Sequence, residues 1–270
     1  MNGRLSCGAA AALGPSPDRG GRADQEDNYL VCADGRVRFL EGGAERVVDG
    51  WGDGALLAVA DGMGGHADGA LASGAAVQAL SRLWGAPRAA DPEDALRSFI
   101  LRAHARLRDL ARARGSAELG TTLTAAWLLD GRLVWCQVGD SRLYLLRAGR
   151  LQQLSRDHTR REFAERDQRP VPGQPDALAQ AFLFGSRGLS ADQALRIDRG
   201  VDTGVVPLQA GDRLLLCSDG VWGPLPPDQL RVGLSGAGPC AVVAARLLGR
   251  AVAHGGTDNL SAVVATVRGA

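Results

Sequence analysis

The sequence predicts an α+β fold in which antiparallel β-sheets are covered by helices. Apolar runs rich in Val, Leu and Thr are joined by two-residue turns, which are Asp-Gly at 34–35 and 130–131 and Ala-Gly at 148–149. Links this short connect antiparallel strands. Strand-like and helix-like segments also come in blocks along the chain, and this order argues against a doubly wound parallel sheet.

The length and composition of the chain favour one large folding unit. Its 270 residues contain no internal repeat, and 45% of them are hydrophobic, so the chain can bury a substantial core. No segment has the composition of a linker, and we expect a single domain over residues 1–270. A charged, Pro-rich segment at 156–180 shows little apolar periodicity, which predicts a mobile excursion between strands.

The predicted strands are short apolar runs bounded by turn residues. The first lies near the N-terminus, where the stretch is mostly Ala and Gly and matches a signal peptide poorly. The longest runs, such as ALLAVA at 55–60, are too short to span a bilayer. The strands are expected at Leu5–Ala11, Tyr29–Ala33, Arg36–Leu40, Arg46–Val48, Ala55–Ala60, Thr121–Leu129, Leu133–Val138, Arg142–Arg147, Arg213–Ser218 and Leu260–Val267.

Amphipathic segments predict three helices. The clearest covers Pro92–Arg114 and begins after Asp91, a good N-cap, with Asp94 at the third helical position. Its apolar side chains recur at helical spacing and form one stripe. The stripe consists of Leu96, Phe99, Ile100, Ala103, Leu107 and Leu110. The other two helices are expected at Gly69–Leu83 and Cys240–Ala253.

The charge balance gives no reason to expect binding to nucleic acid or to an anionic membrane. The formal net charge is +1, and every basic side chain is Arg. The five cysteines are odd in number and form no metal-binding pair, so we expect buried thiols in a reducing cytoplasm. They are Cys7, Cys32, Cys136, Cys217 and Cys240.

Aspartates recur at the ends of the predicted strands. Asp61 follows ALLAVA, and Asp219 follows RLLLCS. Asp140 follows LVWCQVG, and Asp258 precedes NLSAVVATV. Asp-Gly and Gly-Asp are also ordinary turn dipeptides, and Asp140 alone fits the tip of a hairpin between its two neighbouring strands. Asp61 and Asp219 are harder to explain as turns, because a carboxylate at the end of a buried strand needs a neutralising partner.

The surrounding residue types favour a hard cation as that partner. The chain has no Lys, and its four His are not spaced as a zinc site. Oxygen ligands without nitrogen or sulfur suit Mg²⁺ or Mn²⁺. Two carboxylates about 4 Å apart repel by roughly 4 kcal/mol at an effective dielectric constant of about 20. Two divalent cations reverse this repulsion and are a recurrent device for phosphoester displacement. Gly62, directly after Asp61, would let a backbone carbonyl approach a metal.

Seven motifs follow one another through nearly the whole chain. They are GRADQEDN at 21–28, ADGMGGHADG at 60–69, ELGTTLTAAWL at 118–128, VGDSRLYLLR at 138–147, LSRDHT at 154–159, GDRLLLCSDGVW at 211–222 and GGTDNLSAVV at 255–264. In this order they resemble the metal-dependent PP2C-type (PPM) serine/threonine protein phosphatases in their bacterial form. The resemblance implies a four-layer α-β-β-α sandwich of two antiparallel sheets flanked by helices, with the site at one end.

The resemblance also implies how two Mn²⁺ or Mg²⁺ ions would be held. Asp61 would bridge the two ions, and Asp219 and Asp258 would complete the shell of the first. The other implied contacts are a second-metal bond from the Gly62 carbonyl, water ordering by Glu26 and Asp27, and substrate phosphate binding by Arg22.

The implied mechanism needs no covalent intermediate. A metal-bridged water or hydroxide, its pKa lowered, would attack the phosphorus of phosphoserine or phosphothreonine in line. The metals and Arg22 would meet the negative charge on the phosphoryl oxygens, since a guanidinium fork matches phosphate well. The predicted catalytic residues are therefore Asp61, Asp219 and Arg22.

Three departures from the family pattern limit what the resemblance implies. Met63 stands where some relatives carry a histidine that was proposed as general acid, and His66 is a candidate substitute, although a loop histidine is more often structural. Asp140 matches a position that binds a third metal in some members, but Gly223 replaces another aspartate of that site, which argues against a third ion. The segment at 156–180 matches the family's flap and is short.

The sequence leaves two other functions open. One is a catalytically weak PP2C-like domain that binds phosphoproteins or a partner, although the full set of Asp61, Asp219 and Asp258 argues against it. The other is a two-metal phosphoesterase for small molecules, which a closed pocket would favour. The expected partners are phosphorylated proteins, including the autophosphorylated form of a serine/threonine kinase. We expect a cytoplasmic monomer without a membrane span or a nucleic-acid partner.

Overall fold

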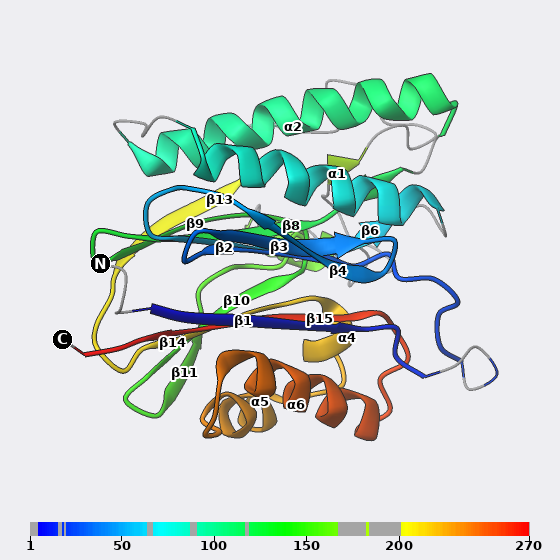
Figure 1. Cartoon of the computed structure of the whole chain (residues 1–270). Helices are drawn as coiled ribbons and strands as arrows, with labels where there is room; N and C mark the ends of the chain where they lie inside the picture. The colour runs from blue at the N-terminus through cyan, green and yellow to red at the C-terminus, as the bar shows by residue number, and fades with distance from the viewer. Residues whose placement is uncertain are drawn as a thin grey trace.

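The computed structural model describes residues 5–15, 18, 20–63, 67–86, 91–116, 119–166, 182–183 and 201–269. In this part of the chain two antiparallel sheets lie face to face, and helices cover the outer face of each (Figure 1). This arrangement is the predicted four-layer α-β-β-α sandwich.

One sheet is built around β15, Leu260–Val267, and is called the β15 sheet. Its strand order is β1-β15-β14-β10-β11. The first and last described strands of the chain pair along their whole length, from Leu5 opposite Val267 to Ala12 opposite Leu260. The other strands are β1 (Leu5–Ala12), β14 (Arg213–Cys217), β10 (Arg142–Arg147) and β11 (Arg150–Gln153).

The second sheet contains β5, Ala55–Ala60, and is called the β5 sheet. Its order is β13-β9-β8-β5-β2-β3-β4. All six residues of β5 are buried, because the strand is covered on both faces. The other strands are β13 (Asp202–Pro207), β9 (Arg132–Val138), β8 (Leu123–Leu129), β2 (Asn28–Ala33), β3 (Arg36–Glu41) and β4 (Ala44–Asp49). A short ladder joins β12 (Phe182–Leu183), β7 (Gly120–Thr121) and β6 (Gly62–Met63).

Helices form the two outer layers (Figure 1). The β5 sheet is covered by α1 (Ala67–Trp84) and α2 (Pro92–Arg114). The β15 sheet is covered by α4 (Asp219–Trp222), α5 (Pro227–Leu234) and α6 (Cys240–Ala253). A further short helix, α3 (Arg160–Arg166), follows β11. Among the described residues, none of the helices has the length and apolar character that crossing a bilayer requires.

The core between the two sheets consists of aliphatic side chains that alternate along facing strands. Leu57 and Val59 of β5 belong to the same buried cluster as Leu214 and Leu216 of β14, and all four are fully buried. Burying an aliphatic side chain of this size contributes about 1.5–3 kcal/mol. β5 ends one residue before Asp61 and β14 ends two residues before Asp219, so the packing of these strands also fixes where the two carboxylates emerge.

The predicted hairpin turns are confirmed. Asp34–Gly35, Asp130–Gly131 and Ala148–Gly149 each place both central residues at positive φ, between 48° and 76°. This is the type I′ geometry, whose twist matches that of paired strands. Each turn joins two antiparallel neighbours, β2 to β3, β8 to β9 and β10 to β11.

The predicted start of α2 is also confirmed. The Asp91 side chain accepts a hydrogen bond from the backbone N–H of Glu93 at 2.9 Å, and Pro92 is the first helical residue. At the other end Gly115 has a φ of 64° and closes the helix. The apolar stripe predicted for this helix is buried against the β5 sheet except at Leu110, which is half-buried.

The structure contains elements that the sequence did not predict, among them β11, β13, α4 and α5, and it also changes three of the stated expectations. β9 and β10 lie in different sheets, so Asp140 lies on a crossover and the hairpin-tip alternative is wrong. The run at Thr121–Leu129 is interrupted at Thr122 and divides into β7 and β8. The excursion at 156–180 begins with ordered structure, the helix α3, and its part from 167 to 180 lies outside the described residues.

Candidate metal centre

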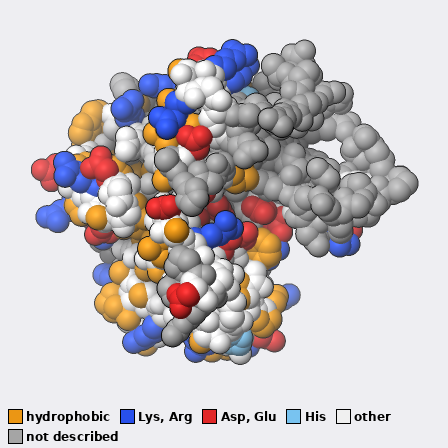
Figure 2. Space-filling model, turned by 90° about the vertical axis from the view of Figure 1, so that its right-hand side faces the viewer, with side chains coloured by type: hydrophobic (Ala, Val, Ile, Leu, Met, Phe, Trp, Pro, Cys, Tyr) orange, Lys and Arg blue, Asp and Glu red, His pale blue; other side chains and the backbone are white. Residues whose placement is uncertain are grey.

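A pocket of about 310 Å³ opens at one end of the sandwich. Figure 2 looks onto this end, where acidic side chains and arginine gather near the middle of the view. The pocket is lined by Arg22, Glu26, Asp61, Gly62, Met63, Thr122, Asp140, Asp219, Asp258 and Asn259. A larger cavity, about 820 Å³, lies on the other side of the 23–28 segment and is lined mainly by small and apolar residues. The convergence of carboxylates makes the smaller pocket the candidate functional site.

The backbone of Asp61 is held on both sides by threonines. Its N–H donates to Thr122 Oγ1 at 2.9 Å, and its carbonyl accepts from the Thr122 N–H at 2.8 Å and from Thr121 Oγ1 at 2.9 Å. The Thr122 hydroxyl in turn lies 2.8 Å from the hydroxyl of Ser141. The main chain at Asp61 is therefore fixed independently of its carboxylate, which points into the pocket lined by acidic groups.

Glu26 reaches the pocket through a close approach of three backbone segments. Its N–H donates to Asn259 Oδ1 at 2.8 Å, and its carbonyl accepts from Ser73 Oγ of α1 at 2.6 Å. A Cβ atom placed on Gly62 would lie 2.2 Å from the Gly69 carbonyl oxygen and 2.5 Å from the Glu26 carbonyl oxygen. Only glycine at position 62 permits this contact, which explains the lack of side-chain bulk after Asp61.

A Gly62→Ala variant is therefore expected to be destabilised. The added methyl group overlaps backbone oxygen atoms that cannot move aside as a flexible side chain would, and overpacking of this kind costs about 1–3 kcal/mol. At roughly 2–4 °C per kcal/mol for a domain of this size, the melting temperature should fall by about 2–12 °C. The control is Gly249→Ala in α6, where an added Cβ meets nothing within 4 Å. An equal or higher melting temperature for Gly62→Ala would contradict the steric argument.

Asp219 enters the pocket as the first residue of α4, and Asp27 supports it from behind. Asp27 is 2% exposed and does not line the pocket, although we predicted that it would order metal-bound waters. Its carboxylate accepts from Ser218 Oγ at 2.6 Å, and the same hydroxyl accepts from the Ser261 N–H at 3.1 Å. The Asp27 carboxylate thus connects the start of β2 to the strand end that carries Asp219.

Arg22 lies at the rim of the pocket and is bound to a predicted metal ligand. Its Nε and Nη2 atoms donate to the two carboxylate oxygens of Asp258 at 2.7 and 2.8 Å, in a bidentate pair. The Arg22 side chain is 58% exposed, so it can also reach an anion that enters from solvent. Asp258 receives a further bond from the Asn259 N–H at 2.8 Å, which orients its carboxylate.

The carboxylates of the pocket disfavour one another's ionisation. Burial, followed by the charges of Asp27, Asp219 and Asp140, raises the pKa of Asp61 well above its ordinary value. Burial and the neighbouring Asp258 raise the pKa of Asp219. Burial, with Asp219 as the next cause, raises the pKa of Asp140 to about 7. Burial also raises the pKa of Asp27 to about 7, with added repulsion from Asp219 and Asp258. This accumulation of negative charge calls for cations.

The donor set fits hard divalent cations. Its atoms are carboxylate and backbone oxygens, the ligands that Mg²⁺ and Mn²⁺ prefer. Within the described ranges, no three Asp, Glu, His or Cys side chains are already drawn together around one metal position. Instead Arg22 lies on Asp258, and the remaining carboxylates surround open space. His66, the candidate proton donor, lies outside the described residues.

Sequence reasoning missed the residues that hold the ligands in place. Thr122 and Asn259 line the pocket, and Ser218 bonds the buried Asp27. Each lies beside a residue that the sequence analysis singled out. Thr122 follows Thr121, the first residue of a predicted strand, while Asn259 follows Asp258 and Ser218 precedes Asp219. Adjacency to a candidate ligand was the available signal, but it does not say which neighbours face the site.

Comparison with known proteins places the chain in a family. Residues 46–233 match the family described as Protein phosphatase 2C. The chain belongs to the protein phosphatase 2C family. Among curated relatives of this family, the serine/threonine phosphatase stp of Listeria welshimeri is 30% identical over 221 residues, which cover 77% of this chain and 83% of the relative.

A longer protein phosphatase 2C relative is also similar. The serine/threonine protein phosphatase PstP of Mycobacterium tuberculosis is 34% identical over 215 residues, 78% of this chain, and the match spans only 40% of PstP. The solved catalytic domain of PstP, in complex with two manganese ions, is 29% identical and has a TM-score of 0.74. The match covers 98% of this chain and 99% of that domain. Staphylococcus aureus Stp1 has a TM-score of 0.76 at 21% identity over 100% of this chain and 97% of Stp1, and this likeness bears on the fold alone.

Proposed function

We propose that this chain is a metal-dependent protein serine/threonine phosphatase and that residues 1–270 form one phosphatase domain. The observation that carries the proposal is the convergence of Glu26, Asp61, Asp219 and Asp258 on one pocket with Arg22 at its rim, in a member of the protein phosphatase 2C family. The pocket opens at the end of the sandwich, as access for a side chain of a folded phosphoprotein requires.

Several residues in and around the pocket have roles that their geometry permits. Two divalent cations, Mn²⁺ or Mg²⁺, would act when bound as Lewis acids toward phosphoryl oxygens and would lower the pKa of water. Asp61, Asp219 and Asp258 would hold them, together with the Gly62 carbonyl and Glu26. Thr121 and Thr122 keep Asp61 in place by binding its backbone. Asp27, behind the pocket wall, accepts a hydrogen bond from Ser218, and its ordering of metal-bound waters stays a prediction.

The partners follow from the same proposal. The substrates are phosphoproteins, and an autophosphorylated serine/threonine kinase is the expected one among them. We propose that the protein acts in the cytoplasm, since all five cysteines are free thiols and four of them are buried. We also propose that it is a monomer.

The test is hydrolysis of a phosphothreonine peptide, measured as released phosphate with Mn²⁺, with Mg²⁺ and after chelation. We expect turnover with added metal and none after chelation. A small-molecule phosphoester such as p-nitrophenyl phosphate serves as the comparison, and a higher kcat/KM for it than for the peptide would favour the small-molecule alternative. Full activity in the chelated protein would overturn the proposal, and binding of phosphopeptide without turnover in any metal would indicate a binding domain.

An Arg22→Ala variant is expected to raise KM for the phosphopeptide more than it lowers kcat. Hydrogen bonds to charged groups contribute about 1.5–3 kcal/mol, which corresponds to about 10- to 150-fold in KM. Steady-state kinetics at saturating Mn²⁺ provide the measurement. Arg46→Ala is the control, because Arg46 is 61% exposed, does not line the pocket, and has a 3.8 Å contact with the exposed Glu41. An unchanged KM in Arg22→Ala would show that Arg22 does not bind the phosphate and serves Asp258 alone.

A further inference from the structure

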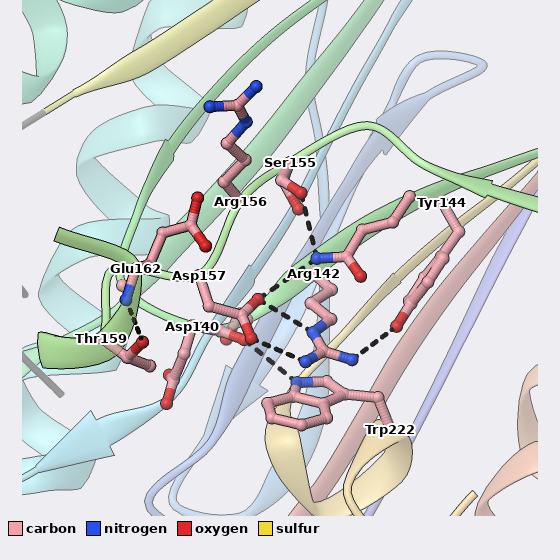
Figure 3. A network of polar contacts seen from close by, with 12 residues as sticks. Asp140, Arg142, Tyr144, Ser155, Arg156, Asp157, Thr159, Glu162 and Trp222 are labelled. Atoms are coloured by element: carbon pink, nitrogen blue, oxygen red, sulfur yellow. Dashed lines mark hydrogen bonds and ion pairs between the residues drawn. The ribbon is translucent and has the colours of Figure 1, made fainter. Parts of the chain in front are cut away.

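A polar cluster centred on Arg142 lies beside the pocket (Figure 3). The Arg142 guanidinium stacks on the Trp222 ring, 3.4 Å from its centroid. Its Nε and Nη2 atoms donate to the two carboxylate oxygens of Asp157 at 2.9 and 2.6 Å, and Nη1 donates to the Tyr144 hydroxyl at 3.0 Å. We call Arg142, Asp157, Tyr144 and Trp222 the Arg142 clamp. None of its members lines the 310 Å³ pocket.

The clamp joins segments that carry pocket carboxylates. Trp222 and Asp219 are the two ends of the single-turn helix α4, so contacts that hold the indole also restrain the backbone that carries Asp219. The indole Nε1–H also donates to the backbone carbonyl of Asp140 at 3.0 Å. Arg142 itself begins β10, two residues after Asp140. Stacking of Arg142 on Trp222 therefore holds the Asp140 crossover and α4 together.

The Asp157 side of the clamp extends this connection to the segment that follows β11. The His158 N–H donates to the Gly139 carbonyl at 2.9 Å, and the Gly139 N–H donates to His158 Nδ1 at 3.2 Å. Gln137 Nε2 donates to the carbonyls of Gly139 and Arg156 at 3.0 and 2.8 Å. Segment 156–158 is thus bonded to the crossover through both backbone and side chains, and it leads directly into α3.

We propose that Arg142 is a positioning residue of the metal centre, which fixes Asp219 and Asp140 relative to each other by clamping Trp222 and Asp157. The guanidinium is suited to this task because its flat face stacks on the indole while its edge binds the carboxylate in a bidentate pair. Lysine offers neither the flat face nor the fork. The inference rests on the proposed function for the role of the carboxylates, but the connection itself is a property of the fold.

The same strand supplies a matched control. At the other end of β10, Arg147 makes an equivalent bidentate pair, with Nε and Nη2 at 2.8 and 2.6 Å from the two oxygens of Asp212. Arg147 also bonds the carbonyl of Pro207 and has no contact with the pocket. Replacing either arginine breaks a bidentate ion pair of β10, but only Arg142 connects to Asp219.

The experiment compares Arg142→Gln, Arg142→Lys and Arg147→Gln by Mn²⁺ binding, followed as loss of the free-ion signal in electron paramagnetic resonance. Loss of a residue that orients metal ligands typically weakens metal affinity about 10- to 100-fold. We expect this loss of Mn²⁺ affinity in Arg142→Gln and a smaller loss in Arg142→Lys. In Arg147→Gln we expect the affinity to change by less than about twofold, although its melting temperature should fall by a similar amount. Trp222→Leu should weaken Mn²⁺ binding as Arg142→Gln does. The variant that combines both substitutions should have an Mn²⁺ affinity no lower than that of the single variant with the lower affinity.

A second measurement separates this inference from the proposed function. Hydrogen exchange of the metal-free protein should rise in Arg142→Gln at residues 139–141 and 219–222, and should not rise there in Arg147→Gln. Wild-type Mn²⁺ affinity in Arg142→Gln, or the same loss in Arg147→Gln, would overturn the inference. If the wild-type protein binds no Mn²⁺, the proposed function fails, and the exchange comparison alone decides whether Arg142 holds the two segments. If Arg142→Gln does not fold, Trp222→Leu and Asp157→Asn provide the same two readouts.

Discussion

An Asp61→Asn variant is expected to lose phosphopeptide hydrolysis almost completely while its fold stays intact. Asp61 is the carboxylate that the other pocket acids surround, and an amide there lowers the negative charge that would hold two cations. Loss of several kcal/mol of charge stabilisation corresponds to a decrease in kcat/KM of at least about 10³-fold. The measurement is phosphate release at saturating Mn²⁺, with a thermal melt of the same sample.

The melting temperature makes this prediction specific. In metal-free protein the variant should melt at the same or a higher temperature than the wild type, because a buried carboxylate whose ionisation its neighbours oppose has been neutralised. The Asp61 backbone bonds to Thr121 and Thr122 do not involve the side chain and remain. Asp228→Asn is the control, since Asp228 is exposed and remote from the pocket. Activity within tenfold of the wild type would exclude Asp61 as a central ligand.

The metal-free protein is expected to lose stability as the pH rises from about 4 to about 7, and Mn²⁺ should reverse this loss. Burial raises the pKa of Asp27 and of Asp140 to about 7, above the ordinary value of 3.8. A group with a raised pKa binds more protons in the folded state, so its full contribution is present below the unfolded pKa and disappears as the pH passes the folded pKa. Cations that bind only the folded state stabilise it by about 2.7 kcal/mol at 100 times Kd.

Thermal melts across this pH range, with chelator and with Mn²⁺, test the sign. The slope of melting temperature against pH should be negative in chelator and shallower or positive in Mn²⁺. Asp27→Asn should flatten the slope in chelator without abolishing Mn²⁺ binding, because Asp27 does not line the pocket. A melting temperature that rises with pH in the chelated protein would show that the pocket acids are neutralised by protein groups instead of by protons or metals.

Elements with local signals were predictable from the sequence, because the same residues that start or end them determine their geometry. The turn at Asp34–Gly35 adopts positive φ at both positions, and Asp91 caps α2. β13 was missed because its residues show little alternation between apolar and polar side chains, and because it ends in Pro207, which is uncommon within a strand. α4 was missed because four residues have no helical period to read.

Pairings between distant segments were the least predictable part. β9 and β10 follow one another closely in sequence, yet their hydrophobic residues pack into different sheets. No short-range pattern distinguishes this crossover from a hairpin, which is why Asp140 also fitted a turn. At the site, the carboxylates were predictable because their residue type and their place after buried strands suggest metal binding. The position of Thr122 in the pocket lining and the burial of Asp27 were not predictable, because they depend on how segments distant in sequence pack together.

The place of β15 between β1 and β14 has a consequence for protein synthesis. Both β1 and β14 pair with β15, so their inner edges lack hydrogen-bond partners until it is made. The pocket residues Asp258 and Asn259 directly precede this strand. Within the strand, the N–H of Ser261 donates to Ser218, which supports the pocket. A nascent chain on the ribosome therefore carries Asp61 and Asp219 without the contacts that complete the site. We therefore expect activity to begin only after β15 has inserted between two strands that were made earlier.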